Sequence, residues 1–137
     1  MVPRIYLRPL VGTEVFIFEE VRIVQEELKK IKERARLDKK TIVLPESNDK
    51  RTLIAAAKIM EEGIADIIMV GDEEKIMDGA GWLEVDLSGV EVINPQTTPK
   101  LDEYVNLLYE TRKAKGMTPE KAREILLKDY LTFGIVM

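Results

Sequence analysis

The sequence contains neither cysteine nor histidine among its 137 residues. The lack of cysteine excludes a disulfide framework, a thiolate metal site and a cysteine nucleophile within this chain. The lack of histidine excludes catalytic pairs in which an imidazole activates a serine or a cysteine. Any acid–base chemistry carried out by this chain must therefore use Asp, Glu, Lys or Tyr side chains.

The sequence also lacks a long apolar run. No segment approaches the roughly 20 consecutive apolar residues of a membrane-spanning helix. Prolines, arginines and a glycine interrupt the apolar residues within residues 1–12, so the N-terminus has no signal-peptide core. We therefore expect a cytoplasmic protein without a membrane partner.

Positive charge is in the minority, with 21 basic against 25 acidic residues and a net charge of −4. Nucleic acids and anionic membranes are bound mainly by accumulated positive charge, so we expect no nucleic-acid partner. A local basic cluster does occur within residues 29–40. Acidic residues are interleaved with it and no aromatic residue is near, which favours a solvated helix face over a nucleic-acid site.

The spacing of apolar residues predicts alternating strands and helices. Short apolar runs predict buried strands at residues 41–45, 65–71 and 90–95. Helical spacing and capping residues predict helices near 16–37, 50–62, 101–115 and 119–128, with a short acidic helix after Gly71. This alternation predicts an α/β fold of three-layer α/β/α architecture, with a mainly parallel sheet covered on both faces.

Local signals refine these elements. Asp49 or Asn48 is expected to cap the helix near 50–62, and Gly63 to end it. Helical spacing places the inner face of the helix near 101–115 at Tyr104, Leu107, Leu108 and Thr111.

The last residues, 131–137, are apolar and carry no stop signal. They indicate a helix interrupted midway, and hence a longer protein cut near residue 137.

The charged loop from Glu46 to Arg51 is one candidate site, because a helix start offers free backbone N–H groups to an anion. It lacks the spacing of a Walker A or a G-x-G-x-x-G motif. We interpret it as structural, with Asp49 as the helix cap and an ion pair between Glu46 and Arg51. A ligand loop is the alternative.

Two other charged clusters have ordinary explanations. The acids at 72–74 fall in the first turn of a helix, where its dipole stabilises them, and we expect no metal site. Arg112, Lys113 and Lys115 fall at a helix C-terminus, where cations are also expected. Yet the planar guanidinium of Arg112 is suited to a phosphate or carboxylate.

Several separated blocks resemble the N-terminal part of the phosphate acetyltransferase family, which includes the phosphate butyryltransferases. They are "KIKERARLDKKTIVLPESNDKRTLIAAAKIMEEGIADIIMVGDEEKI", "DLSGVEVINP" and "DEYVNLLYETRKAKGMTPEKAREILLKDYLTFGIVM". The resemblance runs from about Glu27 to Met137 and covers well under half of a full family member. Residues 1–23 find no counterpart and are interpreted as an N-terminal extension, and residues 24–137 as the N-terminal part of the family's enzyme, truncated at its C-terminus.

The resemblance implies the incomplete first domain of a two-domain acyltransferase with an active-site cleft between its domains. Members interconvert acetyl phosphate plus coenzyme A and acetyl-coenzyme A plus phosphate, by direct attack of the coenzyme A thiolate. Coenzyme A is thus a substrate, and no bound cofactor is implied. The family's catalytic residues lie in later segments, so this chain holds no catalytic residue and is expected to be inactive alone.

One binding residue carries over from the family. Its "YELRK" motif matches "YETRK" here, which assigns binding of the substrate or coenzyme A phosphate to Arg112. Thr111 replaces the usual leucine, and Ser47 stands where a glycine is common.

Other functions stay open. The chain is alternatively a non-catalytic binding or assembly module, one half of a split enzyme that pairs with a complementary C-terminal half, or a phosphate butyryltransferase relative. A homo-oligomer is expected on the same grounds, since an incomplete sheet leaves an exposed edge.

Overall fold

A three-stranded parallel sheet organises the chain from residue 39 onward. The computed structural model describes residues 14–137, with side chains from residue 20, and divides the chain into two compact units, Met1–Asp38 and Lys39–Met137. The expectation of no signal-peptide core falls on residues outside the described range. None of the described helices is both long and apolar enough to cross a membrane.

The first unit contributes one helix, α1, at Glu14–Leu37. This confirms the helix predicted near 16–37. Its predicted apolar stripe is at least half exposed at Val21, Val24, Leu28 and Ile31.

The strands of the second unit are β1 (Lys40–Leu44), β2 (Ala65–Val70) and β3 (Glu91–Ile93). They pair in the order β1-β2-β3, all parallel, with Ile42 opposite Ile67 and Met69 opposite Val92. The predicted strands are therefore confirmed, although β3 is three residues shorter than the apolar run that predicted it. Because side chains alternate along a strand, central β2 presents Ile67 and Met69 to one face and Val70 to the other.

Helices α2 (Lys50–Glu62) and α3 (Glu73–Leu83) cover the first face. Both begin at an aspartate whose side chain accepts backbone N–H groups, Asp49 for α2 and Asp72 for α3. Helix α2 ends at Gly63, in the left-handed region at φ 65°, as its sequence predicted. The buried residues of this face form one core: Leu53, Ala56, Ile67, Met69, Ile76, Ala80 and Leu87.

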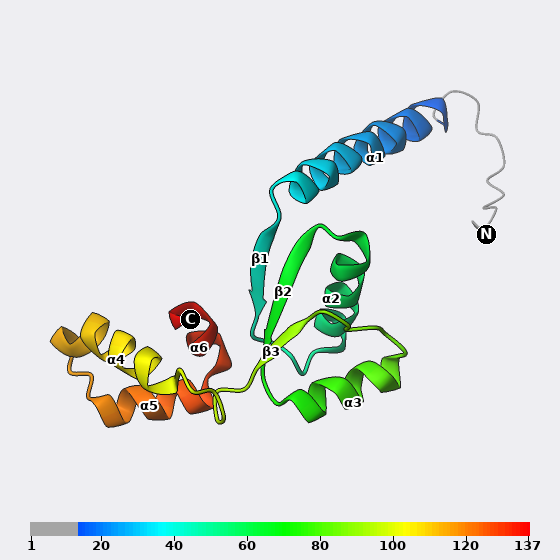
Figure 1. Ribbon diagram of the computed structural model, residues 1–137. Helices are drawn as coiled ribbons and strands as arrows, with labels where there is room; N and C mark the ends of the chain where they lie inside the picture. Colours follow the sequence, from blue (N-terminus) through cyan, green and yellow to red (C-terminus); the bar gives the residue numbers. More distant parts are fainter. Residues whose placement is uncertain (1–13) are drawn as a thin grey trace. The chain divides into compact units, whose positions relative to one another are not determined.

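Helix α6 (Tyr130–Val136) packs against β2 on the opposite face, and α4 (Leu101–Arg112) and α5 (Pro119–Lys128) share its core (Figure 1). Their core is centred on Phe133, whose ring meets that of Tyr104 edge-on at a centroid distance of 5.3 Å. The other buried members of this core are Val70, Val105, Leu108, Ala122 and Leu126. Helices on both faces confirm the predicted α/β fold.

The structure corrects two details on this face. Leu107 and Thr111 were predicted on the inner side of α4, but both are exposed, and Val105 is buried instead. The predicted helix over 101–115 also stops at Arg112, and a 3₁₀ turn, η1 (Lys113–Lys115), continues it to Gly116 at φ 80°.

Candidate functional site

Arg112 is the last residue of α4, directly before the 3₁₀ turn. Tyr104, Val105 and Leu108 anchor the helix by their burial, so the position of its final turn is fixed by the core of this face. The Arg112 side chain itself is exposed.

Arg112 lines a hollow of about 430 Å³ formed by α4, α5 and the start of α6. Apolar side chains form part of its wall, from Leu108, Met117 and Ile125. Polar groups form the remainder, from Glu124, Lys128, Asp129 and Thr132.

The two acids of the hollow are already engaged. Glu124 Oε1 accepts from Lys128 Nζ at 2.6 Å, and this hydrogen bond lowers the pKa of the Glu124 carboxyl. Asp129 caps α6: its carboxylate accepts from Thr132 Oγ1 at 2.5 Å and from the backbone N–H of Leu131 at 3.1 Å. The hydrogen bond from Thr132 is the main cause that lowers the pKa of Asp129.

Arg112 differs in this respect from Lys113, the next residue along the chain. Lys113 Nζ donates to Glu110 Oε2 at 2.5 Å, which raises the pKa of Lys113. Among the side chains of residues 20–137, Arg112 forms no ion pair. Its five N–H donors are therefore available to an oxyanion, and their planar fork matches two oxygens of a phosphate or a carboxylate.

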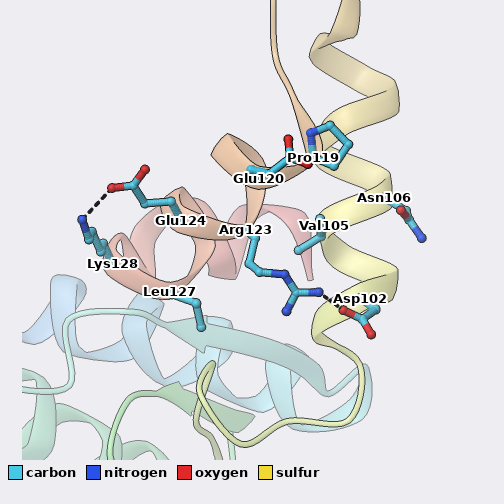
Figure 2. Close-up of a pocket in the computed structure, with 9 residues that line it drawn as sticks. All are labelled: Asp102, Val105, Asn106, Pro119, Glu120, Arg123, Glu124, Leu127 and Lys128. Atoms are coloured by element: carbon cyan, nitrogen blue, oxygen red, sulfur yellow. Dashed lines mark hydrogen bonds and ion pairs between the residues drawn. The ribbon is translucent and has the colours of Figure 1, made fainter.

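A larger groove of about 790 Å³ lies on another side of the α4–α5 pair (Figure 2). Arg123 of α5 reaches across to Asp102 of α4 in an ion pair, and the Glu124–Lys128 pair lies farther along α5. Sequence reasoning did not single out Arg123. Its partner is 21 residues away, so only the packing of the two helices brings the charges together.

The charged loop before α2 has the structural role that we expected, with a different ion pair. Asp49 Oδ1 accepts the backbone N–H of Arg51 at 2.8 Å and caps the helix. Arg51 Nη2 pairs with Asp49 Oδ2 at 2.7 Å, so the predicted pair between Glu46 and Arg51 is wrong. Asp49 is closer in the chain and lies at the helix start, where its carboxylate is already oriented by the cap.

The acidic cluster at the start of α3 also has a structural role. Asp72 accepts backbone N–H groups of Glu74 and Lys75 at 3.1 and 3.4 Å. In the described part of the chain, no group of three acidic side chains is arranged to hold a metal ion.

Comparisons with known proteins give a consistent result. The profile of the family described as "phosphate acetyl/butaryl transferase" matches residues 27–137. A phosphate acetyltransferase of Acetivibrio thermocellus is 49% identical over 110 residues, which cover 80% of this chain and 32% of that protein. One from Clostridium acetobutylicum is 46% identical over 107 residues, or 78% of this chain and 32% of that protein.

Solved structures agree with these sequence matches. A EutD phosphotransacetylase from Staphylococcus aureus superposes with a TM-score of 0.73 at 36% identity, covering 82% of this chain and 33% of that one. A phosphotransacetylase from Streptococcus pyogenes superposes with a TM-score of 0.75 at 28% identity, covering 82% and 34%. The chain thus spans about a third of the length of the relatives it matches.

Proposed function

The chain belongs to the phosphate acetyl/butaryl transferase family, and from this premise we propose that it forms the N-terminal part of an acyltransferase. The proposed reaction interconverts acetyl phosphate plus coenzyme A and acetyl-coenzyme A plus phosphate. The observation that carries the proposal is the match over residues 27–137 to relatives named phosphate acetyltransferase. A cytoplasmic location is part of the same proposal.

In this reaction the thiolate sulfur of coenzyme A attacks the carbonyl carbon of acetyl phosphate. The carbon–oxygen bond to the phosphoryl group breaks, and phosphate leaves with its bonding electron pair. Negative charge is present on the phosphate throughout, so cationic donors placed beside it stabilise binding and departure. Coenzyme A acts as a substrate in this scheme, and it also carries phosphate groups of its own.

We assign to Arg112 the binding of a phosphate group, on acetyl phosphate or on coenzyme A. Its support is the exposed guanidinium, which forms no ion pair with a side chain of residues 20–137, and the adjoining hollow of about 430 Å³. Lys128, in the same hollow, forms an ion pair with Glu124 at 2.6 Å, so its positive charge is already partly compensated.

A chimera tests the role of Arg112. Residues 27–137 replace the matching segment of the Acetivibrio thermocellus relative, and Arg112→Ala is compared with Lys115→Ala, an exposed cation three residues away. A charge-assisted hydrogen bond contributes about 1.5–3 kcal/mol, so the Arg112 variant should raise the KM for one substrate about ten- to a hundredfold. Unchanged KM values for both substrates would show that Arg112 binds neither.

The 137-residue chain alone should not catalyse the reaction, because its family's catalytic residues are expected outside it. The purified chain is assayed for coenzyme A-dependent release of phosphate from acetyl phosphate, alone and after mixing with the separately produced C-terminal two-thirds of a relative. We expect activity only in the mixture. Release of phosphate by the chain alone would refute the proposal that the catalytic residues lie outside it.

A second candidate function is an assembly module, favoured by the edge strands β1 and β3 of the three-stranded sheet, because edge strands can pair with another chain. The partner would be a second copy of the chain or a complementary C-terminal half. Light scattering of the purified chain, with and without that half, distinguishes a monomer from either complex.

A further inference from the structure

The outer edge of β1 is open within the part of the chain that the structure describes. β1 has β2 on one side, and no strand of residues 14–137 pairs with its other side. An edge strand presents a row of backbone N–H and C=O groups to the side on which it has no neighbour. Such a row is a template on which a strand of another chain can pair.

The two edges of the sheet differ in how well they are protected. Natural proteins protect an edge strand by making it very short or by placing charges on it. β3 has both features, because it spans only three residues and begins with Glu91. β1 spans five residues, and its only charged residue, Lys40, lies at its start. We therefore expect another chain to pair with β1 rather than with β3.

The middle of β1 carries an apolar side chain that is only partly covered. Ile42 is 42% exposed, whereas Ile67, its register partner on β2, is buried. The two side chains point to the same face of the sheet, so the core of that face covers Ile67 and leaves part of Ile42 bare. A strand added beside β1 would place a side chain about 5 Å from Ile42 Cβ and cover it.

Helix α6 adds exposed apolar side chains on the other face of the same edge. A Cβ at Gly134 would come within 3.2 Å of Val43 Cγ1, so α6 lies against β1. Leu131 and Ile135 are each two residues from the buried Phe133, and two residues turn a helix by about 200°. They therefore project on the side of α6 away from the core, and they are 58% and 75% exposed.

We propose that two copies of the chain join through β1, antiparallel, across a two-fold axis at Ile42. Full overlap of the two five-residue strands places Ile42 opposite its own copy and Lys40 opposite Leu44 of the second copy. The two Lys40 residues then lie four residues apart along the sheet, about 14 Å, which exceeds the screening length of roughly 8 Å in physiological salt. A parallel pair would place them side by side, where like charges destabilise a sheet.

The dimer contains one continuous sheet in the order β3-β2-β1-β1-β2-β3. Because the two-fold axis is perpendicular to the sheet, both α6 helices lie on the same face, where Leu131 and Ile135 meet those of the second copy. This apolar area is needed, because five-residue strands pair over only about 17 Å and a stable interface buries roughly 1,200 Å² or more. The dimer specifies the partner of the assembly module proposed above and rests on that candidate function, not on the acyltransferase reaction.

Sedimentation of the 137-residue chain tests the dimer and its surface. We expect a particle of twice 15.7 kDa that dissociates on dilution. Ile42→Lys places two like charges opposite each other across the axis and should convert the dimer to a monomer. Ile54→Lys is the matched control, because Ile54 is a 48% exposed isoleucine of α2 that lies beside residues 84–88 before β3, and it should leave the dimer intact.

Single cysteines test the register, because the chain itself has none. Opposite side chains of an antiparallel pair have Cβ atoms about 4.5–5.5 Å apart, close to the spacing of a disulfide. Mild oxidation should therefore cross-link Ile42→Cys readily, and Ile54→Cys much more slowly. Lys40→Cys alone should resist cross-linking, because its two copies lie about 14 Å apart, but it should cross-link when mixed with Leu44→Cys.

The proposal fails if the chain sediments as a monomer at every concentration, or if positions 42 and 54 cross-link equally. A dimer that survives Ile42→Lys would keep the assembly module but move it to another surface, and so overturn pairing through β1. A chain that is monomeric alone and binds the separately produced C-terminal two-thirds of a relative would assign the partner's role to that half. That result overturns self-pairing and leaves the acyltransferase proposal standing.

Discussion

Replacing Gly71 with alanine should destabilise the chain through a contact with Ser47. Gly71 follows β2 directly and is buried, and its backbone N–H donates to Ile93 of β3 at 3.0 Å. A Cβ at this position would overlap Ser47 Oγ and come within 3.2 Å of Ser47 Cβ and 3.3 Å of Ile76 Cδ1. The absence of a side chain at Gly71 is therefore what leaves room for the buried serine.

The cost has two parts that can be separated. Crowding in a packed interior costs about 1–3 kcal/mol, and the φ of 158° at Gly71, which L residues rarely adopt, adds about 1–3 kcal/mol. A Ser47→Gly background removes the two closest atoms but leaves the backbone unchanged. The penalty of Gly71→Ala should therefore fall by about 1–2 kcal/mol in that background, and not vanish.

Urea unfolding followed by circular dichroism measures all four members of this cycle. Gly81→Ala is the control, because its added Cβ meets nothing within 4 Å and an alanine inside a helix is favoured over glycine by about 0.5–1 kcal/mol. It should stabilise the chain. The reasoning is wrong if Gly71→Ala costs less than about 0.5 kcal/mol or costs the same in both backgrounds.

Three further predictions concern the packing and the caps. Phe133→Ala should lower the free energy of unfolding by about 3–5 kcal/mol in urea melts, because this ring is fully buried at the centre of its core. Thr118→Ala should cost about 1 kcal/mol, because the Thr118 hydroxyl accepts the N–H of Lys121 at 3.2 Å and caps α5, whereas Thr111→Ala in the exposed last turn of α4 should cost nothing or stabilise. Hydrogen bonds from Arg51 lower the pKa of Asp49 from 3.8 to about 2. The ionised carboxylate therefore stabilises the fold fully above pH 3.8, and this contribution is lost as the pH falls toward 2. Acid titrations followed by circular dichroism should show a shallower loss of stability over that interval in Asp49→Asn, and an unchanged slope would contradict it.

The elements were predictable where local chemistry marks their ends. The boundaries of α2 and α5 follow from single residues: Asp49 accepts a backbone N–H group at the start of α2, Gly63 adopts a left-handed φ at its end, and Thr118 precedes a proline at the start of α5. These interactions span a few residues and do not depend on the rest of the fold. The periodicity of strands and helices predicted the parallel α/β arrangement for a similar reason.

Features that depend on tertiary packing were not predictable. The spacing of apolar residues along α4 allows either Leu107 or Val105 on its inner face. Val105 is the buried one because the helix packs against both α5 and α6. The pairing of Asp102 with Arg123 requires the two helices to be side by side. Ser47 lies in a polar loop and reads as a surface residue, but it is buried because a glycine faces it across the sheet edge.

Arg112 illustrates both what the sequence could predict and what it could not. Its exposed end-of-helix position follows from the spacing of α4, and its resemblance to a family motif supplied the hypothesis of phosphate binding. The hollow beside it is completed by α5 and α6, which pack there through a core that includes Phe133 and Leu126. The sequence therefore indicated the residue and not the shape of its surroundings.

The order of the strands has a consequence for synthesis on the ribosome. Each strand pairs with the one translated just before it, so β1, α2 and β2 can assemble as soon as residue 70 has emerged. The opposite face of β2 remains bare for much longer, because its cover is centred on Phe133. While about 60 further residues are being made, at about 5–20 residues per second, Val70 and its neighbours stay exposed for several seconds and are open to chaperones. The nascent chain thus presents a sheet with one covered face and one exposed apolar face until α6 has been made.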